Sequence, residues 1–106
     1  MLGVKELLLK LILTSAYRVQ RGYKTAGSSI AAGGYLDVQV TFGHAYASAP
    51  IVVASLRADS ASTTGENAKV EAYVIAQSTT DATIRLFNSA SIARTPSFNW
   101  IAVGPV

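Results

Sequence analysis

Alternating apolar and polar residues are the main signal in this sequence. In the stretch YLDVQVTF, Tyr35–Phe42, an apolar side chain stands at every second position from Leu36 onward. This period is typical of a strand with one buried face in an antiparallel sheet. Further strands are predicted at 50–57, 68–77, 82–88 and 96–104, separated by segments rich in turn-forming residues. Because no helical pattern lies between them, the sequence predicts an all-β fold, an antiparallel β-sandwich over residues 35–106.

The chain begins with a segment of a different kind. Residues 4–14 are rich in Leu, Lys and Glu, and Val4, Leu8 and Leu11 repeat at the spacing of a short helical seam. An isolated helix of this length is only marginally stable in water, so it needs a partner surface. We therefore expect residues 1–15 to form an N-terminal α-helical unit that associates with copies of itself or docks onto another protein.

Two other interpretations of the N-terminal region are less favoured. Glu6 and Lys10 interrupt the apolar run, which leaves too short a core for a signal peptide and too few apolar residues for a bilayer span. No membrane insertion is therefore expected. Residues 16–34 read as a polar connector, although the weak alternation around Tyr17 and Val19 would allow one edge strand there.

Some predicted strands are apolar on both faces. In the last strand Trp100 points one way, whereas Ile101 and Val103 point the other. A sandwich covers only one face of a strand, and no crossover helices are predicted, so a neighbouring subunit is the natural cover for the second face. We therefore expect an obligate oligomer. The expected oligomer contacts are Val4, Leu8, Leu11, Tyr73 and Trp100.

Composition narrows the classes of function. The chain has 106 residues, of which 14% are charged, with a net charge of +3 and no Cys. So few charges favour a surface that is partly buried between subunits. The lack of Cys excludes disulfides, thiolate metal sites and a Cys nucleophile. Lys and Arg are scattered along the chain apart from Arg18, Arg21 and Lys24, so we expect no nucleic-acid partner.

The sequence carries no catalytic motif. His44, the only histidine, follows Gly43 in a predicted turn, and no Gly-x-Ser-x-Gly motif accompanies it. We interpret it as a partly exposed loop residue. The acidic residues stand singly, with no metal-ligand spacing and no paired carboxylates. We expect no enzyme, no metal and no cofactor, while an activity that depends on His44 stays open as a third hypothesis.

Three segments combine into a pattern that extends over residues 35–104. They are VTFGHAYASAPIVVASL, NAKVEAYVIAQSTTDATIRLFN and PSFNWIAVG. Their shared features are a strand ending in Phe42, the loop aromatic Tyr46, Pro50 before a Val-rich strand, and Trp100 followed by an aliphatic and a small residue. This pattern resembles the H-type lectin domain and the lectin-like modules of phage and prophage tail and fibre proteins. The resemblance implies a six-stranded antiparallel β-sandwich that assembles as a parallel trimer.

The lectin site of that family carries over less well than its fold. In the family, sugar lies in a groove at the subunit interface and is held partly by a basic residue early in the long central strand, near which Lys69 stands. An aromatic and a His that contact the sugar fall near Ser89 and Ala90, which cannot make those contacts. The sugar-binding candidates in this chain are Lys69, Tyr46, Arg57, Glu71 and Asp37.

The resemblance implies a non-enzymatic structural protein of a phage or prophage virion, associated with the tail or fibre. Its expected partners are two further copies of itself, other virion proteins and, in host attachment, a cell-surface glycan. The alternative is a carbohydrate-binding module that recognises host or cell-surface glycans as its main role. Before assembly into the virion, the protein is expected to be soluble in the host cytoplasm.

Overall fold

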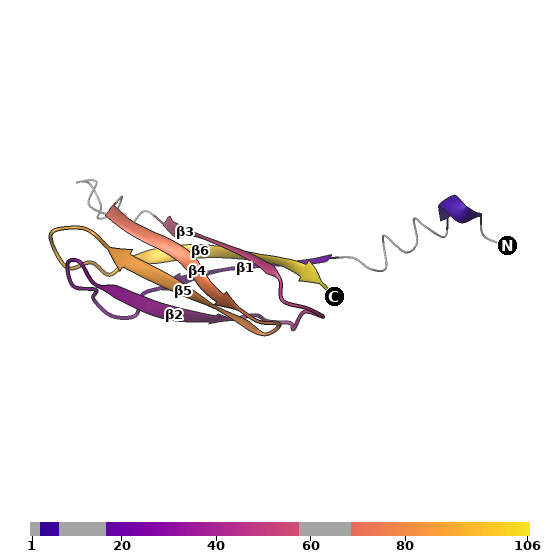
Figure 1. Ribbon diagram of the computed structural model, residues 1–106, viewed down its shortest axis with the longest axis horizontal. Helices are drawn as coiled ribbons and strands as arrows, with labels where there is room; N and C mark the ends of the chain where they lie inside the picture. The colour runs from indigo at the N-terminus through magenta and orange to yellow at the C-terminus, as the bar shows by residue number, and fades with distance from the viewer. Residues whose placement is uncertain (1–2, 7–16, 58–68) are drawn as a thin grey trace.

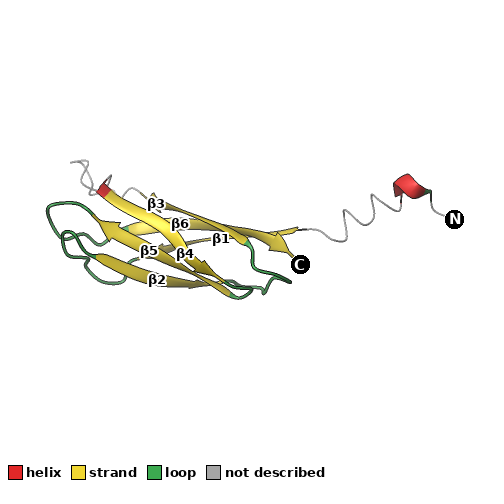
Figure 2. Cartoon of the chain, in the orientation of Figure 1, coloured by secondary structure: helices red, strands yellow, loops and turns green. Residues whose placement is uncertain are grey.

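Almost all regular structure in the described part of the chain is β-strand. The computed structural model describes residues 3–6, 17–57 and 69–106, with helical geometry only at residues 4–6 and a single 3₁₀ residue at Lys69 (Figure 2). The strands are β1 (Tyr17–Thr25), β2 (Tyr35–Thr41), β3 (Ile51–Arg57), β4 (Val70–Gln77), β5 (Asp81–Asn88) and β6 (Ser97–Pro105). The predictions of an all-β chain and of six strands are confirmed.

The six strands form two antiparallel sheets that lie as two layers in Figure 1. One sheet has the order β1–β6–β3 and the other has the order β2–β5–β4. The middle strands β6 and β5 each pair along both of their edges. The second sheet contains a register shift between Val74 and Ala76, where Ile75 is the extra residue of β4.

One face of each sheet is buried in a shared core. Residues of β5 alternate between fully buried and half-buried, as the period of two predicts. The core residues of the two middle strands are Ala82, Ile84, Leu86, Phe98, Trp100 and Ala102. Burying a large apolar side chain stabilises a fold by about 1.5–3 kcal/mol, so these two strands hold the sheets together.

An aromatic cluster closes one end of the core. The rings of Phe42 and Tyr46 meet edge to face at 5.3 Å between centroids, and Phe42 lies 5.7 Å from Trp100. Tyr46 is 4% exposed, and its hydroxyl donates a hydrogen bond to the Ala102 carbonyl at 3.1 Å. Trp100 is 8% exposed. The structure therefore corrects two predictions, since Tyr46 and Trp100 fill the chain's own core rather than a sugar site and a subunit contact.

Residues 17–25 belong to the β fold, so the predicted connector over 16–34 is wrong for this stretch. β1 pairs with β6 along its whole length, from Tyr17 opposite Pro105 to Thr25 opposite Ser97. The positions of β1 that face inward include Arg18, Gln20 and Gly22, which hides the apolar alternation. An edge strand can be held by backbone pairing without that signal.

The Asn88 side chain, at the end of β5, forms hydrogen bonds to two loops. It is fully buried, and its amide nitrogen donates to the carbonyls of Ile30 and Ile92 at 3.0 Å and to that of Ala31 at 3.4 Å. Its amide oxygen accepts from the Ala90 backbone N–H at 2.9 Å. One side chain thus satisfies backbone groups from two loops that are far apart in sequence.

The predicted N-terminal helix is described only in part. Residues 4–6 are helical and Val4 is exposed, while the remainder of the seam, with Leu8 and Leu11, lies outside the described residues. In the part of the chain that the structure describes, no helix has the length and apolar character needed to cross a membrane.

Candidate functional site

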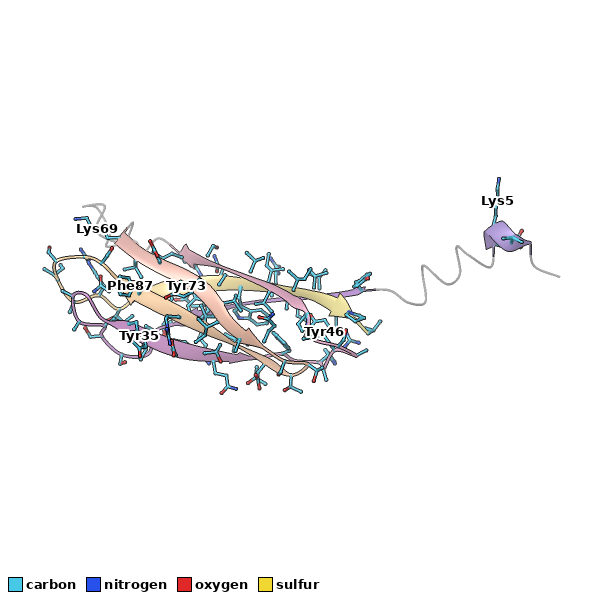
Figure 3. The ribbon with its side chains drawn as sticks, viewed as in Figure 1. Lys5, Tyr35, Tyr46, Lys69, Tyr73 and Phe87 are labelled. Atoms are coloured by element: carbon cyan, nitrogen blue, oxygen red, sulfur yellow. The ribbon has the colours of Figure 1, made fainter. Side chains whose placement is uncertain are left out.

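The five residues predicted to bind sugar do not meet at one place. Figure 3 shows Lys69 and Tyr46 toward opposite ends of the two sheets. Asp37 and Glu71 lie on exposed positions of β2 and β4, whereas Arg57 ends β3 in the other sheet. The sheets instead bring together a different set of residues, of which only Asp37 and Glu71 were predicted.

Asp37 and Glu71 share the outer face of the β2–β5–β4 sheet with several aromatic side chains. Strand pairing places Tyr35, Phe87 and Glu71 in one row across this sheet. The next row contains Asp37, Arg85 and Tyr73. We call these six residues the Tyr35 face. Its three aromatic residues, Tyr35, Tyr73 and Phe87, are labelled in Figure 3.

A bidentate ion pair lies in the middle of the Tyr35 face. The Arg85 Nε donates to Asp37 Oδ1 at 2.8 Å, and an Arg85 terminal nitrogen donates to Oδ2 at 3.0 Å. The guanidinium carbon also lies 4.3 Å from the centroid of the Tyr35 ring. The hydrogen bond from Arg85 lowers the pKa of Asp37, and the same bond raises the pKa of Arg85. Both groups are therefore held charged beside the Tyr35 ring.

This arrangement suits a polyhydroxylated ligand. Rings supply flat apolar surface, and an ionised carboxylate with spare lone pairs can accept hydrogen bonds from hydroxyl groups. Arg85 and Phe87 were absent from the predicted site. The only sequence signal for them was their outward position in β5, because their neighbours come from strands that are far away in the chain. Lys69 immediately precedes β4 on the Glu71 side of this face.

The opposite outer face, on β1–β6–β3, is apolar across one row and over two strands of the next row, where Arg21 occupies β1. Val19, Val103 and Ile51 form one row across the three strands, and Ile101 and Val53 are paired in the next. These five side chains, which we call the aliphatic patch, are 38–75% exposed. The expectation that the last strand is apolar on both faces is confirmed for Ile101 and Val103.

The two sheets differ in charge. The strands of the β1–β6–β3 sheet contain four basic residues and no acidic one. They are Arg18, Arg21, Lys24 and Arg57. The strands of the other sheet contain three acidic residues and one basic residue. Arg57 lies over the Tyr23 ring with 4.5 Å between its guanidinium carbon and the ring centroid, so this predicted sugar contact is on the basic sheet.

His44 is an exposed loop residue, as expected. The Gln20 side chain binds its backbone on both sides, accepting from the His44 N–H at 2.9 Å and donating to the His44 carbonyl at 2.8 Å. Both of these hydrogen bonds involve the main chain of His44 and leave its imidazole ring out. Within the described residues, no three His, Cys, Asp or Glu side chains gather in a way that could hold a metal ion.

No protein-family model matches the chain, and none of the curated proteins compared with it does either. Several solved structures do match the chain. The tailspike protein of Pseudomonas phage LKA1 is 27% identical with a TM-score of 0.64, and the match covers 82% of this chain. An N-truncated R1-type pyocin tail fibre is 21% identical with a TM-score of 0.68, covering 84% of this chain.

A third match is the tailspike of Acinetobacter baumannii bacteriophage AP22, solved in complex with an A. baumannii capsular saccharide. It is 10% identical with a TM-score of 0.67 and again covers 84% of this chain. The chain spans 71% of the pyocin fibre fragment but only 15% and 17% of the two tailspikes. The six-stranded fold of this chain is therefore similar to one module within phage tailspikes and a pyocin tail fibre.

Proposed function

We propose that this chain is a non-enzymatic structural protein of a phage or prophage tail or fibre. In this proposal it is located in the virion, has an H-type-lectin-like β-sandwich and assembles as a homotrimer. The single observation that carries the proposal is the similarity of the fold to modules of phage tailspikes and a pyocin tail fibre over more than four-fifths of the chain.

The aliphatic patch supports self-association. Five aliphatic side chains lie side by side on three strands, and monomeric proteins rarely leave large contiguous apolar patches in water. Burying apolar surface lowers the free energy by about 25 cal/mol per Å², so contact with further copies would stabilise the assembly. Closed rotational symmetry is the usual outcome when identical chains associate, and it would bury the patch without leaving an open end.

The assembly is tested by light scattering coupled to size exclusion over a range of concentrations. The wild-type chain should have three times the monomer mass, and Val53→Asp should lower that mass by placing a charge in the patch. Gln39→Asp, at an exposed position of β2 in the other sheet, is the matched control and should stay trimeric. A monomeric wild type at every concentration would overturn the trimer.

A second candidate function is glycan recognition on the Tyr35 face. It is favoured by the three rings around the Asp37–Arg85 pair. The AP22 tailspike, which shares the fold, was solved with a capsular saccharide bound. A pyranose could lie against the Phe87 and Tyr73 rings while its hydroxyls bond to the Asp37 carboxylate. In a virion this binding would serve attachment to the host surface.

A glycan array probed with the native oligomer tests this second function. The expected result is binding to a defined set of glycans, weakened at least tenfold by Phe87→Ala and by Asp37→Asn. Gln39→Ala, at an exposed position in the same sheet, serves as the control and should bind normally. An array without signal, or binding that is unchanged in both variants, would remove the Tyr35 face as a glycan site.

A further inference from the structure

A pocket of about 550 Å³ lies on the β1–β6–β3 sheet, beside the aliphatic patch. Its floor is the cross-strand pair Gly22 and Trp100, and the Trp100 side chain turns into the core. The surrounding side chains are Arg21, Tyr23, Ser55, Asn99 and Ile101. All five are exposed positions of the three strands, so the pocket is open to solvent.

Strand pairing brings the polar members of this pocket into register. Tyr23 on β1, Asn99 on β6 and Ser55 on β3 form one row across the sheet. Tyr23 is fixed in place, because its hydroxyl bonds to the Ser97 hydroxyl at 3.3 Å and the Arg57 guanidinium lies over its ring. Asn99 occupies the middle of this row, and Ser55 lies next to it on β3.

Hydrogen-bonding capacity in the pocket is unused. Within the described residues, no hydrogen bond or ion pair involves the side chains of Arg21, Ser55 or Asn99. The amide can donate and accept, the hydroxyl can do both, and the guanidinium can donate five hydrogen bonds. These complementary groups converge on one open pocket that is partly walled by an aromatic ring.

Among the described strands of this sheet, no acidic residue compensates the charge of the pocket. No strand of this sheet contains Asp or Glu, so neither Arg21 nor Arg57 has a carboxylate neighbour within its own sheet. Arg85 on the other sheet shows the contrast, since Asp37 holds it in a bidentate pair. A planar guanidinium without a partner is suited to bind carboxylate or phosphate.

We propose that this pocket binds an anionic sugar unit. The acidic group of the sugar pairs with the Arg21 guanidinium, and its ring hydroxyls exchange hydrogen bonds with Asn99 and Ser55 beside the Tyr23 ring. The pocket shares no side chain with the Tyr35 face, so its ligand goes beyond the glycan recognition proposed above. Ile101 belongs to both the pocket and the aliphatic patch, which places the bound sugar at the edge of the proposed subunit contact.

The test is a titration of the full-length protein followed by two-dimensional ¹H–¹⁵N NMR. Galacturonic acid and galactose differ only at C6, and glucose 6-phosphate and glucose form a second matched pair that reports on phosphate instead of carboxylate. At least one anionic sugar should shift the side-chain amide signals of Asn99 and bind at least tenfold more tightly than its neutral counterpart.

Two variants of equal charge then locate the site. Arg21→Gln should weaken binding of the anionic sugar at least fivefold. Arg18→Gln removes the same charge from β1 and should weaken it less than twofold, because Arg18 donates to the Ala45 carbonyl away from the pocket. Asn99→Ala should weaken anionic and neutral sugars alike, and the spectrum of each variant reports whether it is folded.

Three results would overturn the pocket, and two of them also report on the Tyr35 face. Equal binding of anionic and neutral sugars, with shifts confined to residues of the Tyr35 face, would leave glycan recognition there intact. Equal weakening by Arg21→Gln and Arg18→Gln would mean that net charge alone attracts the ligand. If no sugar shifts any signal while the glycan array also gives none, both glycan proposals fail and only the structural role is left.

Discussion

Gly22 and Trp100 face each other across β1 and β6, and a Cβ atom on Gly22 would lie 2.5 Å from the indole nitrogen. The indole therefore occupies the space that any other residue at position 22 would need. An aromatic residue opposite a glycine on an edge strand shields the bare backbone and helps to set the register of the pair. This contact joins β1, the strand that the sequence signalled most weakly, to the core.

Gly22→Ala should destabilise the fold by about 1–3 kcal/mol, because the added methyl group collides with a ring that is already packed. The measurement is urea unfolding at fixed protein concentration, read from the midpoint with an unchanged slope. Gly43→Ala is the control, since its Cβ would meet only the Gln20 Oε1 at an ordinary 3.5 Å. A Gly22→Ala protein as stable as wild type would show that the indole can move aside without cost.

Asn88→Ala should cost about 3 kcal/mol of unfolding free energy. The variant removes the hydrogen bonds to the carbonyls of Ile30 and Ile92 and the one from the Ala90 N–H, at about 1 kcal/mol for each lost hydrogen bond. The Ile30 carbonyl keeps its bond from the Arg94 N–H. Thermal unfolding by circular dichroism measures the loss. Ser91→Ala, at an exposed position of the neighbouring loop, should change stability little. Equal effects of the two substitutions would contradict the role assigned to Asn88.

Tyr46→Phe separates a core role from a ligand role. Loss of the hydrogen bond to the Ala102 carbonyl should lower stability by about 1 kcal/mol and leave any glycan binding unchanged. Chemical unfolding and the glycan array measure the two effects on the same preparation. Tyr17→Phe, at an exposed position, is the control for stability. Weaker glycan binding by folded Tyr46→Phe would restore Tyr46 as a sugar contact.

Stability should fall in acid when the Asp37–Arg85 pair is lost. The pKa of Asp37 is lowered from its ordinary 3.8 in the folded chain, so the pair contributes fully above about pH 3.8 and is lost as pH falls through the folded pKa. The difference in unfolding midpoint between wild type and Asp37→Asn should be constant from pH 7 to pH 5 and shrink below pH 4. A difference that persists undiminished at pH 2 would show that ionisation of Asp37 contributes nothing.

The predicted N-terminal seam is expected to make a separate contribution to assembly. Replacing both Leu8 and Leu11 with Asp should reduce the mass measured by light scattering, because charges would disrupt the predicted apolar seam. Glu6→Gln is a control that changes charge outside the seam. If the double variant keeps its trimeric mass while Val53→Asp dissociates, the sheets alone hold the copies together.

The local pattern predicted most of the strands but not the partners of their outward side chains. The period of two around Val38 and Val40 matches the buried positions of β2, and the turn-rich segments separate the strands that follow. β1 was predicted only as an optional edge strand. Its inward residues are polar or glycine, and its stability comes from β6, which lies at the other end of the chain.

The candidate sites depended on register. Asp37 and Arg85 are 48 residues apart, and only the pairing of β2 with β5 makes them neighbours. Tyr46 looked like a loop aromatic free to meet sugar, but the space beside Gly104 and Pro50 receives its ring. The sequence by itself determined which residues form strands and which face of most strands is apolar, because these depend on near neighbours. Tertiary structure decided which exposed side chains meet, because contacts between distant strands depend on packing and register that no local period encodes.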